Sequence, residues 1–226
     1  MSLDDLRLSD FKTMQQSVFE KLREAILAGH FRPGQRLVER ELAQAMQISR
    51  TPIREALRKL EEEKLVTNIP YRGVFVSEVT AETAAEVYQV RMALEGLAAA
   101  LAAEKAAPED LALLRGIMVD LEKASEKGHL DELIEGNNRF HATIAKLAGN
   151  QVLREILQTL QANIGLLRVT SLSVPGRPEA TLEEHWGIYE AIAAQDVTRA
   201  RELAAEHVRR AGEAAGKELT KRGEEG

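Results

Sequence analysis

The residues best suited to chemistry are basic side chains at the start of one helical segment. Residues 39–57 read as two short helices joined by a tight turn. The second helix opens with two small hydroxyl residues, Ser49 and Thr51. It carries three arginines at intervals of four, Arg50, Arg54 and Arg58. A helix that directs its N-terminal amides and guanidinium groups toward one surface suits DNA phosphates and guanine edges. The segment therefore predicts a DNA-reading helix-turn-helix.

The flanking elements complete a small domain. An amphipathic helix is expected over residues 14–29, with Val18, Leu22 and Ile26 on one face. Two β-rich runs, at 65–69 and 74–77, flank the turn Pro70-Tyr71-Arg72-Gly73 and indicate a hairpin. Three helices followed by a hairpin predict a winged helix-turn-helix domain over residues 1–79.

Beyond Val79 the sequence becomes rich in Ala, Leu and Glu. Breaks at Pro108, Gly128, Gly149 and Asp196, and at the Pro-Gly-Arg-Pro run of 175–178, divide it into helical segments. The segments are expected at about 81–106, 108–127, 130–148, 151–171, 179–194 and 197–219. The sequence thus predicts a mainly α fold, with a six-helix antiparallel bundle over 80–226 after the winged domain.

The charge is distributed unevenly. The chain has a formal net charge of −6, yet residues 32–59 hold seven basic and three acidic side chains. Residues 80–226 hold 17 basic and 24 acidic side chains. Since DNA responds to the local field rather than to the whole-chain total, only the N-terminal domain is expected to contact it.

Composition bounds the setting of the protein. The chain contains no cysteine, which excludes disulfides and thiolate metal sites. No apolar run reaches membrane-spanning length, and the first eleven residues lack the apolar stretch of a signal peptide. We expect a cytoplasmic, nucleoid-associated protein with no membrane partner.

Several motifs together resemble the GntR family of bacterial transcription regulators, in its FadR-like branch with an all-helical (FCD-type) ligand domain. The N-terminal resemblance lies in segments 22–29, 33–37, 50–60 and 71–76. The C-terminal resemblance is looser and lies in Val90–Glu95, Asn138–His141, Glu184-His185 and Ala204–His207.

The resemblance places Arg40, Arg50 and Arg54 at the DNA and the wing-tip Gly73 near the minor groove. By their size, Ser49 and Thr51 suit phosphate contacts, and Arg72 is a candidate for the minor groove. The alternative is that these arginines are solvated charges on an ordinary helix.

The resemblance also implies a divalent metal site in the bundle. Many members of this branch hold a metal with three histidines and an Asp or Asn, which correspond here to His141, His185, His207 and Asn137. Three imidazoles suit Zn²⁺ or Ni²⁺, with positions left for water or an anion. The alternative is that these histidines cap or pack helices.

Such pockets take small organic acids in the family. Arg91 resembles an arginine placed over the pocket, where it would pair with a carboxylate; its alternative partner is Glu95, one turn away. Asn163 and Arg168 are further candidates for effector binding.

These observations lead to one functional hypothesis. We expect a metabolite-responsive regulator, more a repressor than an activator, that binds pseudo-palindromic operator DNA as a homodimer and is not an enzyme. Three alternatives stay open: a metal-free regulator with a larger acyl-type effector, a metal-dependent enzyme built on the bundle, and a constitutive architectural DNA binder.

Overall fold

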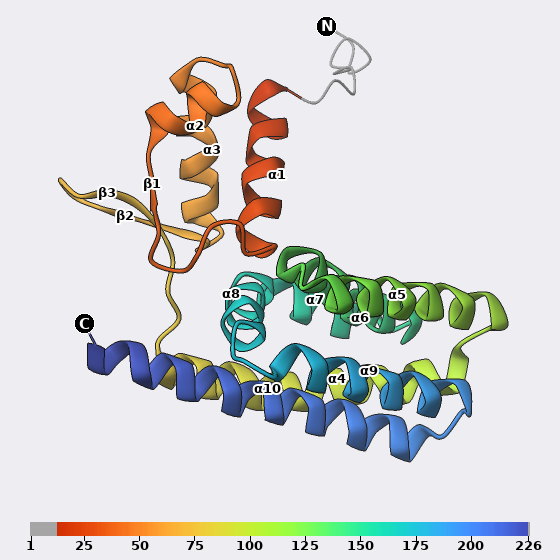
Figure 1. The fold of residues 1–226 in the computed structure, drawn as a ribbon. Coiled ribbons are helices and arrows are strands. Elements are labelled where there is room, and N and C mark those ends of the chain that lie inside the picture. Colours follow the sequence, from red (N-terminus) through yellow and green to blue (C-terminus); the bar gives the residue numbers. More distant parts are fainter. Residues whose placement is uncertain (1–12, 226) are drawn as a thin grey trace, which may run out of the picture.

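The computed structural model describes residues 13–225 and shows two groups of elements that lie side by side (Figure 1). The segment Met1–Phe11, in which no signal peptide is expected, lies outside the described residues. The N-terminal group has three helices and a small sheet, and the C-terminal group is entirely helical. The mainly α fold with a winged helix-turn-helix is confirmed.

The N-terminal group follows the expected order. Its elements are α1 (Met14–Leu27), β1 (Arg36–Leu37), α2 (Glu39–Ala45), α3 (Arg50–Glu62), β2 (Val66–Ile69) and β3 (Gly73–Val76). The strands form an antiparallel sheet in the order β1-β3-β2. The expected hairpin therefore has a third strand, which sequence analysis missed because two residues are too few to show an alternating pattern.

Amphipathic spacing explains how α3 is oriented. Ile53, Ala56, Leu57 and Leu60 are buried against the other N-terminal elements. The arginines at 50, 54 and 58 lie on the opposite, solvent-facing side of the helix. Packing of the apolar face thus presents the basic face outward.

The C-terminal group contains seven helices rather than six. They are α4 (Ala81–Lys105), α5 (Pro108–Lys127), α6 (Leu130–Leu147), α7 (Gln151–Thr159), α8 (Gln161–Leu172), α9 (Arg177–Ala193) and α10 (Val197–Glu225). The helix expected over 151–171 is broken at Leu160. No Gly or Pro marks this break, so tertiary packing decides it. Helix α8 turns out of the plane of the bundle toward α1 (Figure 1).

The two groups share apolar packing. One core joins Leu22, Ile26 and Leu27 of α1 with Ile164 and Leu167 of α8 and with residues of α4 and α10. Gly165 lets α8 approach α1 closely, since a Cβ there would lie 2.2 Å from Leu27 Cδ2. A second core lies within the bundle. Helices α1 and α8 are therefore in direct apolar contact.

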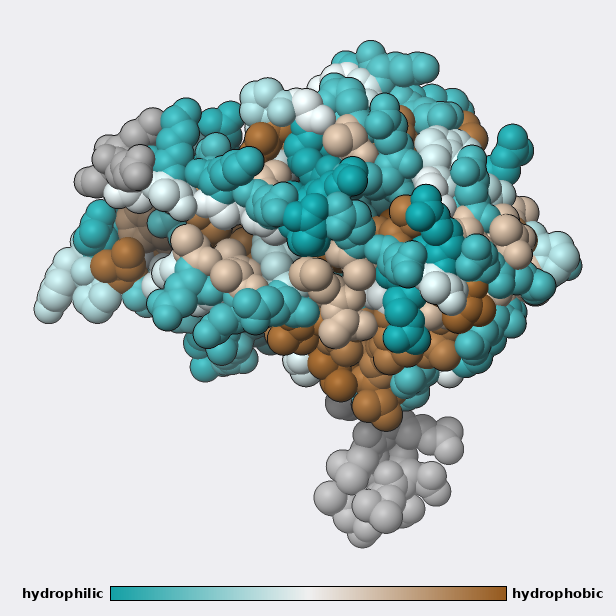
Figure 2. Space-filling model, turned by 90° about the horizontal axis from the view of Figure 1, so that it is seen from below, coloured by the Kyte–Doolittle hydropathy of each residue, from teal (hydrophilic) through white to brown (hydrophobic). Residues whose placement is uncertain are grey.

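The outer side of α4 carries apolar residues at helical spacing, Val90, Leu94, Leu97 and Leu101, and Val90 is 46% exposed. The side of the molecule formed by α4 and α10 shows a continuous apolar area among hydrophilic side chains (Figure 2). Among residues 13–225, no helix combines the length and apolar character that a membrane span requires.

The close packing of α10 against α4 gives a stability prediction. A Cβ on Gly212 would lie 2.9 Å from Cγ of Tyr88, whereas a Cβ on Gly216, one turn later, would meet nothing within 4 Å. Gly216→Ala should stabilise the protein by about 0.5–1 kcal/mol through helix propensity. Gly212→Ala should instead be less stable than Gly216→Ala by about 1–3 kcal/mol because of overpacking. Urea unfolding of both variants measures the difference, and equal midpoints would contradict the packing described.

Candidate nucleic-acid interface and candidate metal centre

The start of α3 forms an exposed polar surface. Ser49 is the N-cap residue, but its side chain makes no capping hydrogen bond. Its hydroxyl is therefore not held by the helix end and can turn to donate to a phosphate. Ser49, Arg50, Thr51 and Arg54 are all exposed, as is Arg40 on the adjoining α2. The structure thus brings five of the residues predicted for DNA binding to one end of the helix pair.

A carboxylate that sequence analysis missed organises this surface. Glu39, at the start of α2, accepts a hydrogen bond from Arg50 at 3.1 Å and two from Arg54, both at 3.1 Å. The hydrogen bond from Arg54 is the main reason why the pKa of Glu39 is lowered, and the same bond raises the pKa of Arg54. Glu39 therefore holds the two guanidinium groups next to each other, 60% and 64% exposed.

The wing supplies the other two predicted residues. β2 and β3 project away from the helices (Figure 1). Gly73 has a φ of +106°, which a residue with a Cβ rarely adopts. Arg72 is exposed and its guanidinium lies over the Phe75 ring, 5.7 Å from the centroid. Tyr71 at the tip is fully exposed.

The three bundle histidines converge. His141 comes from α6, His185 from α9 and His207 from α10, and one ligating nitrogen of each lies within 4.8 Å of the others. The Nε2 atoms of His141 and His207 are 3.3 Å apart. The nitrogens of a tetrahedral zinc site with Zn–N distances of about 2.0–2.1 Å are separated by about 3.3 Å. The convergence expected from the resemblance is thus present.

Two carboxylates fix the orientation of two of these rings. Glu95 lies 2.5 Å from Nδ1 of His141, and Glu184 lies 2.7 Å from Nδ1 of His207. A ring that donates from Nδ1 presents its other nitrogen, Nε2, as the free ligand atom. Glu184 is itself held by two hydrogen bonds from Arg177, at 2.8 and 2.7 Å.

Burial keeps the imidazoles neutral. It lowers the pKa of His141 to about 3, lowers the pKa of His185 well below its usual range and also lowers that of His207. For Glu184, burial alone would raise the pKa, but hydrogen bonds from His207 and Arg177 lower it to about 2. Neutral imidazoles beside ionised carboxylates are the protonation states that metal binding requires.

His185 gives the clearest test of whether a metal fits. Its ring stacks on Phe140 with centroids 4.1 Å apart. Both of its nitrogens are buried without a hydrogen-bond partner among the described residues. A buried imidazole that only packed a core would normally have at least one partner. The donor set therefore fits a divalent metal. Asn137 is buried and lines the same small cavity as His141 and His207.

The three residues expected to bind the effector, Arg91, Arg168 and Asn163, lie in different surroundings. Arg91 is 1% exposed and its Nε donates to Glu95 at 2.9 Å, so the pairing within α4 is formed. Its group at Nη1 is buried without a partner among the described residues, in the small polar cavity beside the histidines. Arg168 lines both this cavity and a larger one.

Asn163, the remaining residue expected to bind the effector, lies away from both cavities at the histidines. It lines a groove against Lys64, Thr67 and other residues near the wing, not either cavity at the histidines. Asn163 precedes Arg168 by five residues, which turns the two side chains about 140° apart on an α-helix.

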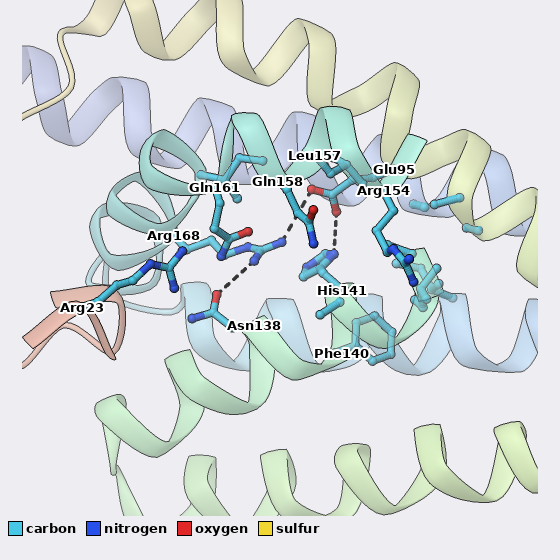
Figure 3. Close-up of a pocket in the computed structure, with 18 residues that line it drawn as sticks. Arg23, Glu95, Asn138, Phe140, His141, Arg154, Leu157, Gln158, Gln161 and Arg168 are labelled. Carbon is cyan, nitrogen blue, oxygen red and sulfur yellow. Dashed lines mark hydrogen bonds and ion pairs between the residues drawn. The ribbon is translucent and has the colours of Figure 1, made fainter. Parts of the chain in front are cut away.

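The larger cavity has a volume of about 470 Å³ and reaches His141, Glu95 and Arg168 (Figure 3). Arg154 and Gln158 of α7, Gln161 of α8 and Arg23 of α1 also line it. Sequence analysis missed these four residues. Only the break at Leu160 and the docking of α1 bring them together, and neither leaves a local signal.

Comparison with known proteins agrees with both halves of the structure. Residues 14–76 match the model of bacterial regulatory proteins of the gntR family, and residues 86–210 match the FCD domain. The chain is 31% identical over 201 residues to the HTH-type transcriptional regulator YdhC of Bacillus subtilis, covering 88% of this chain and 90% of YdhC. It is 27% identical over 192 residues to the HTH-type transcriptional repressor RspR of Escherichia coli, covering 85% and 84%.

Solved structures give the same result. E. coli McbR superimposes with a TM-score of 0.76 at 28% identity, covering 88% of this chain and 95% of McbR. A putative GntR regulator from Rhodococcus sp. RHA1 superimposes with a TM-score of 0.75 at 25% identity, covering 92% and 99%. These relatives are regulators rather than enzymes. The chain belongs to the GntR family, in the branch with an FCD domain, and is a DNA-binding transcriptional regulator.

Proposed function

We propose that this regulator represses metabolic genes and is controlled by a small organic acid that binds at a divalent metal, Zn²⁺ or Ni²⁺, in the helical domain. The observation that carries the proposal is the environment of His185. Neither of its ring nitrogens has a hydrogen-bond partner among the described residues. The ring lies beside His141 and His207, whose orientations are fixed by Glu95 and Glu184. Residues 1–79 would read DNA, and residues 80–226 would bind the effector and form the dimer.

The metal would be held by His141, His185 and His207, with the amide oxygen of Asn137 at the edge of the set. When bound, it supplies a positive centre with coordination positions open to a carboxylate oxygen. Because Asn137 is neutral, the protein ligands add no negative charge that would repel an anion.

The surrounding charges also favour an anion. Arg91 and Arg168 are both buried, and Glu95 is the carboxylate that contacts both. Burial lowers the pKa of Arg168 to about 10, so it stays charged at neutral pH. Nη1 of Arg91 and Nε of Arg168 have no partner among the described residues. The two arginines thus exceed Glu95 by one positive charge and have unused N–H donors, and both features suit a carboxylate.

Operator recognition would use the exposed residues described above: Arg40, Ser49, Arg50, Thr51, Arg54, Arg72 and Gly73. One helix in one half-site discriminates by about 1–3 kcal/mol per bidentate arginine–guanine pair, so two heads on a pseudo-palindrome are the expected arrangement. The partly exposed apolar row on α4, from Val90 to Leu101, supports dimerisation through the helical domain.

A metal-free regulator with a larger acyl-type effector is the second candidate. The observation in its favour is the cavity wall, much of which is apolar and includes Ile144, Leu157, Ile164 and Ile188. Elemental analysis of protein purified without chelator separates the two candidates.

Removal of one guanidinium tests the DNA surface. Arg54 is 64% exposed, so Arg54→Ala should leave the unfolding midpoint nearly unchanged. Operator affinity should fall at least about tenfold, because one bidentate contact is lost in each half-site. Fluorescence anisotropy with a duplex selected from random sequence measures the loss. Arg139→Ala is the matched control, since Arg139 is an exposed arginine that also pairs with a carboxylate, Asp120. Equal affinities of the two variants would exclude α3 as the reading helix.

Removal of one imidazole tests the metal. His185→Ala should reduce the metal content from about one ion per chain to near zero, measured by mass spectrometry of protein purified without chelator. Glu184→Gln keeps all the proposed ligands but weakens the support of His207, and it should weaken metal affinity about 10–100-fold. His129→Ala is the control, because His129 is exposed and contacts Glu132. Full metal content in His185→Ala would refute the assignment.

Acid should destabilise the metal-free protein in a defined window. The pKa of His141 is about 3 in the folded protein against an ordinary value of 6.5. As the pH falls below 6.5, the unfolded chain binds the proton first, so the free energy of unfolding decreases. Chelator-treated protein should therefore keep a constant melting temperature above about pH 7 and lose stability steadily from pH 6.5 to 5. A melting temperature that is flat across this window would mean that the imidazoles are not buried as described.

A further inference from the structure

The large cavity that reaches His141 is lined by residues of both the helical domain and the DNA-reading half. Seventeen of its eighteen lining residues belong to the helical domain, and the eighteenth is Arg23 of α1. In Figure 3, Arg23 enters from one end and Arg154 from the other, with His141, Gln158, Gln161 and Arg168 between them.

We propose that the effector carries two acidic groups, and that Arg23 binds the second one and links it directly to the end of the recognition helix α3. This inference rests on the function proposed above, in that the first acidic group occupies the histidine end of the same cavity.

The charge balance of the cavity supports a dianion. Its lining includes three arginines, Arg23, Arg154 and Arg168, and one carboxylate, Glu95. Two further charges pair with this lining: Glu63 with Arg23, and Arg91 with Glu95. The four arginines and two carboxylates leave two positive charges in excess. A ligand with two carboxylates would neutralise them, whereas a monocarboxylate would leave one uncompensated.

The two ends of the cavity carry arginines with different burial and different hydrogen-bond partners. At the inner end, Arg168 is 6% exposed and donates from Nη1 to Asn138 at 3.0 Å, and its buried Nε has no partner among residues 13–225. At the other end, Arg154 donates to the neutral amide of Gln151, so this bond leaves its charge uncompensated. Gln158 and Gln161 add amide groups between the ends. The arrangement suits an extended molecule rather than a single small anion.

Arg23 connects this cavity to the DNA-reading surface. Its Nε donates to Glu63 at 2.7 Å, and Glu63 is the C-cap residue of α3. That bond uses Nε only, so the two Nη groups keep the capacity to donate to a ligand carboxylate. An acid bound by Arg23 would therefore be two contacts from α3, whose other end carries Arg50 and Arg54. The ligand would fix the angle between α3 and the helical domain without any rearrangement of the bundle.

The ligand class is tested with two matched series of probes. Isothermal titration calorimetry of the full-length, metal-loaded protein compares the dicarboxylates from malonate to suberate with the monocarboxylates of the same carbon number. At one chain length, the dicarboxylate should bind at least about tenfold more tightly, since a charge-assisted hydrogen bond is gained.

Arg23→Gln should remove this preference and bring the dicarboxylate to the affinity of the monocarboxylate. Lys21→Gln is the matched control, because Lys21 is an exposed cation on the same helix and does not line the cavity. Equal binding of the two series by the unaltered protein, or a preference that survives in Arg23→Gln, would overturn the inference and leave the proposed function intact. Failure of every acid in both series to bind would overturn the proposed effector class as well.

The link to α3 is tested separately through Glu63→Gln. This variant keeps Arg23 and should bind the dicarboxylate within about twofold of the unaltered protein. The ratio of operator affinities with and without the dicarboxylate should move toward one, because the connection to α3 is lost. An unchanged ratio in Glu63→Gln would refute the proposed link, and it stays informative even if Arg23→Gln does not fold.

Discussion

The helical domain depends on one buried carboxylate. Glu95 of α4 contacts Arg91 on its own helix, His141 on α6 and Arg168 on α8. Burying a charge costs several kcal/mol unless it is paired, and removing one partner of such a pair costs about 3–5 kcal/mol. Burial alone would raise the pKa of Glu95, but Arg91 and His141 lower it well below its usual range. Three helices are therefore held in one arrangement by the requirement that this carboxylate stay paired.

The same carboxylate relates the two cavities. It orients His141 toward the histidine cluster and neutralises only part of the charge of Arg91 and Arg168. The carboxylate of Glu95 is ionised and paired, but it does not balance the two positive charges of Arg91 and Arg168. In the proposed function, an incoming anion would supply the missing negative charge.

In the DNA-reading half, too, one carboxylate orients several basic side chains. Glu39 aligns Arg50 and Arg54 with each other, so the proposed contacts of these arginines with DNA would cost less conformational entropy. The half is not suspended on a free linker, because α1 shares a core with α8, α4 and α10. Contacts of α8 with α1 join the large cavity and α3 in one continuous packing unit. A ligand in the cavity would shift this unit only by its different affinity for two states.

The sequence by itself determined most of the helices and the wing hairpin. It also indicated the basic face of α3 and the histidine cluster of the helical domain. The periodicity of Ile53, Leu57 and Leu60 predicts which face of α3 is buried, and the turn at 70–73 between two β-rich runs predicts the hairpin. Three histidines at positions matching a known family predict a cluster that the structure shows. These signals are local, or repeat a familiar motif, and so can be read without coordinates.

Tertiary structure alone decided which side chains complete the sites. The break at Leu160 has no Gly or Pro to announce it, yet it divides α7 from α8 and so brings Arg154 and Gln161 to the same cavity. Glu95, Glu184 and Glu39 act through partners on other helices, in two cases more than 20 residues away along the chain. Arg23 meets the cavity only because α1 docks on α8. Long-range packing of this kind depends on the shapes of both surfaces, and no pattern within one segment encodes it.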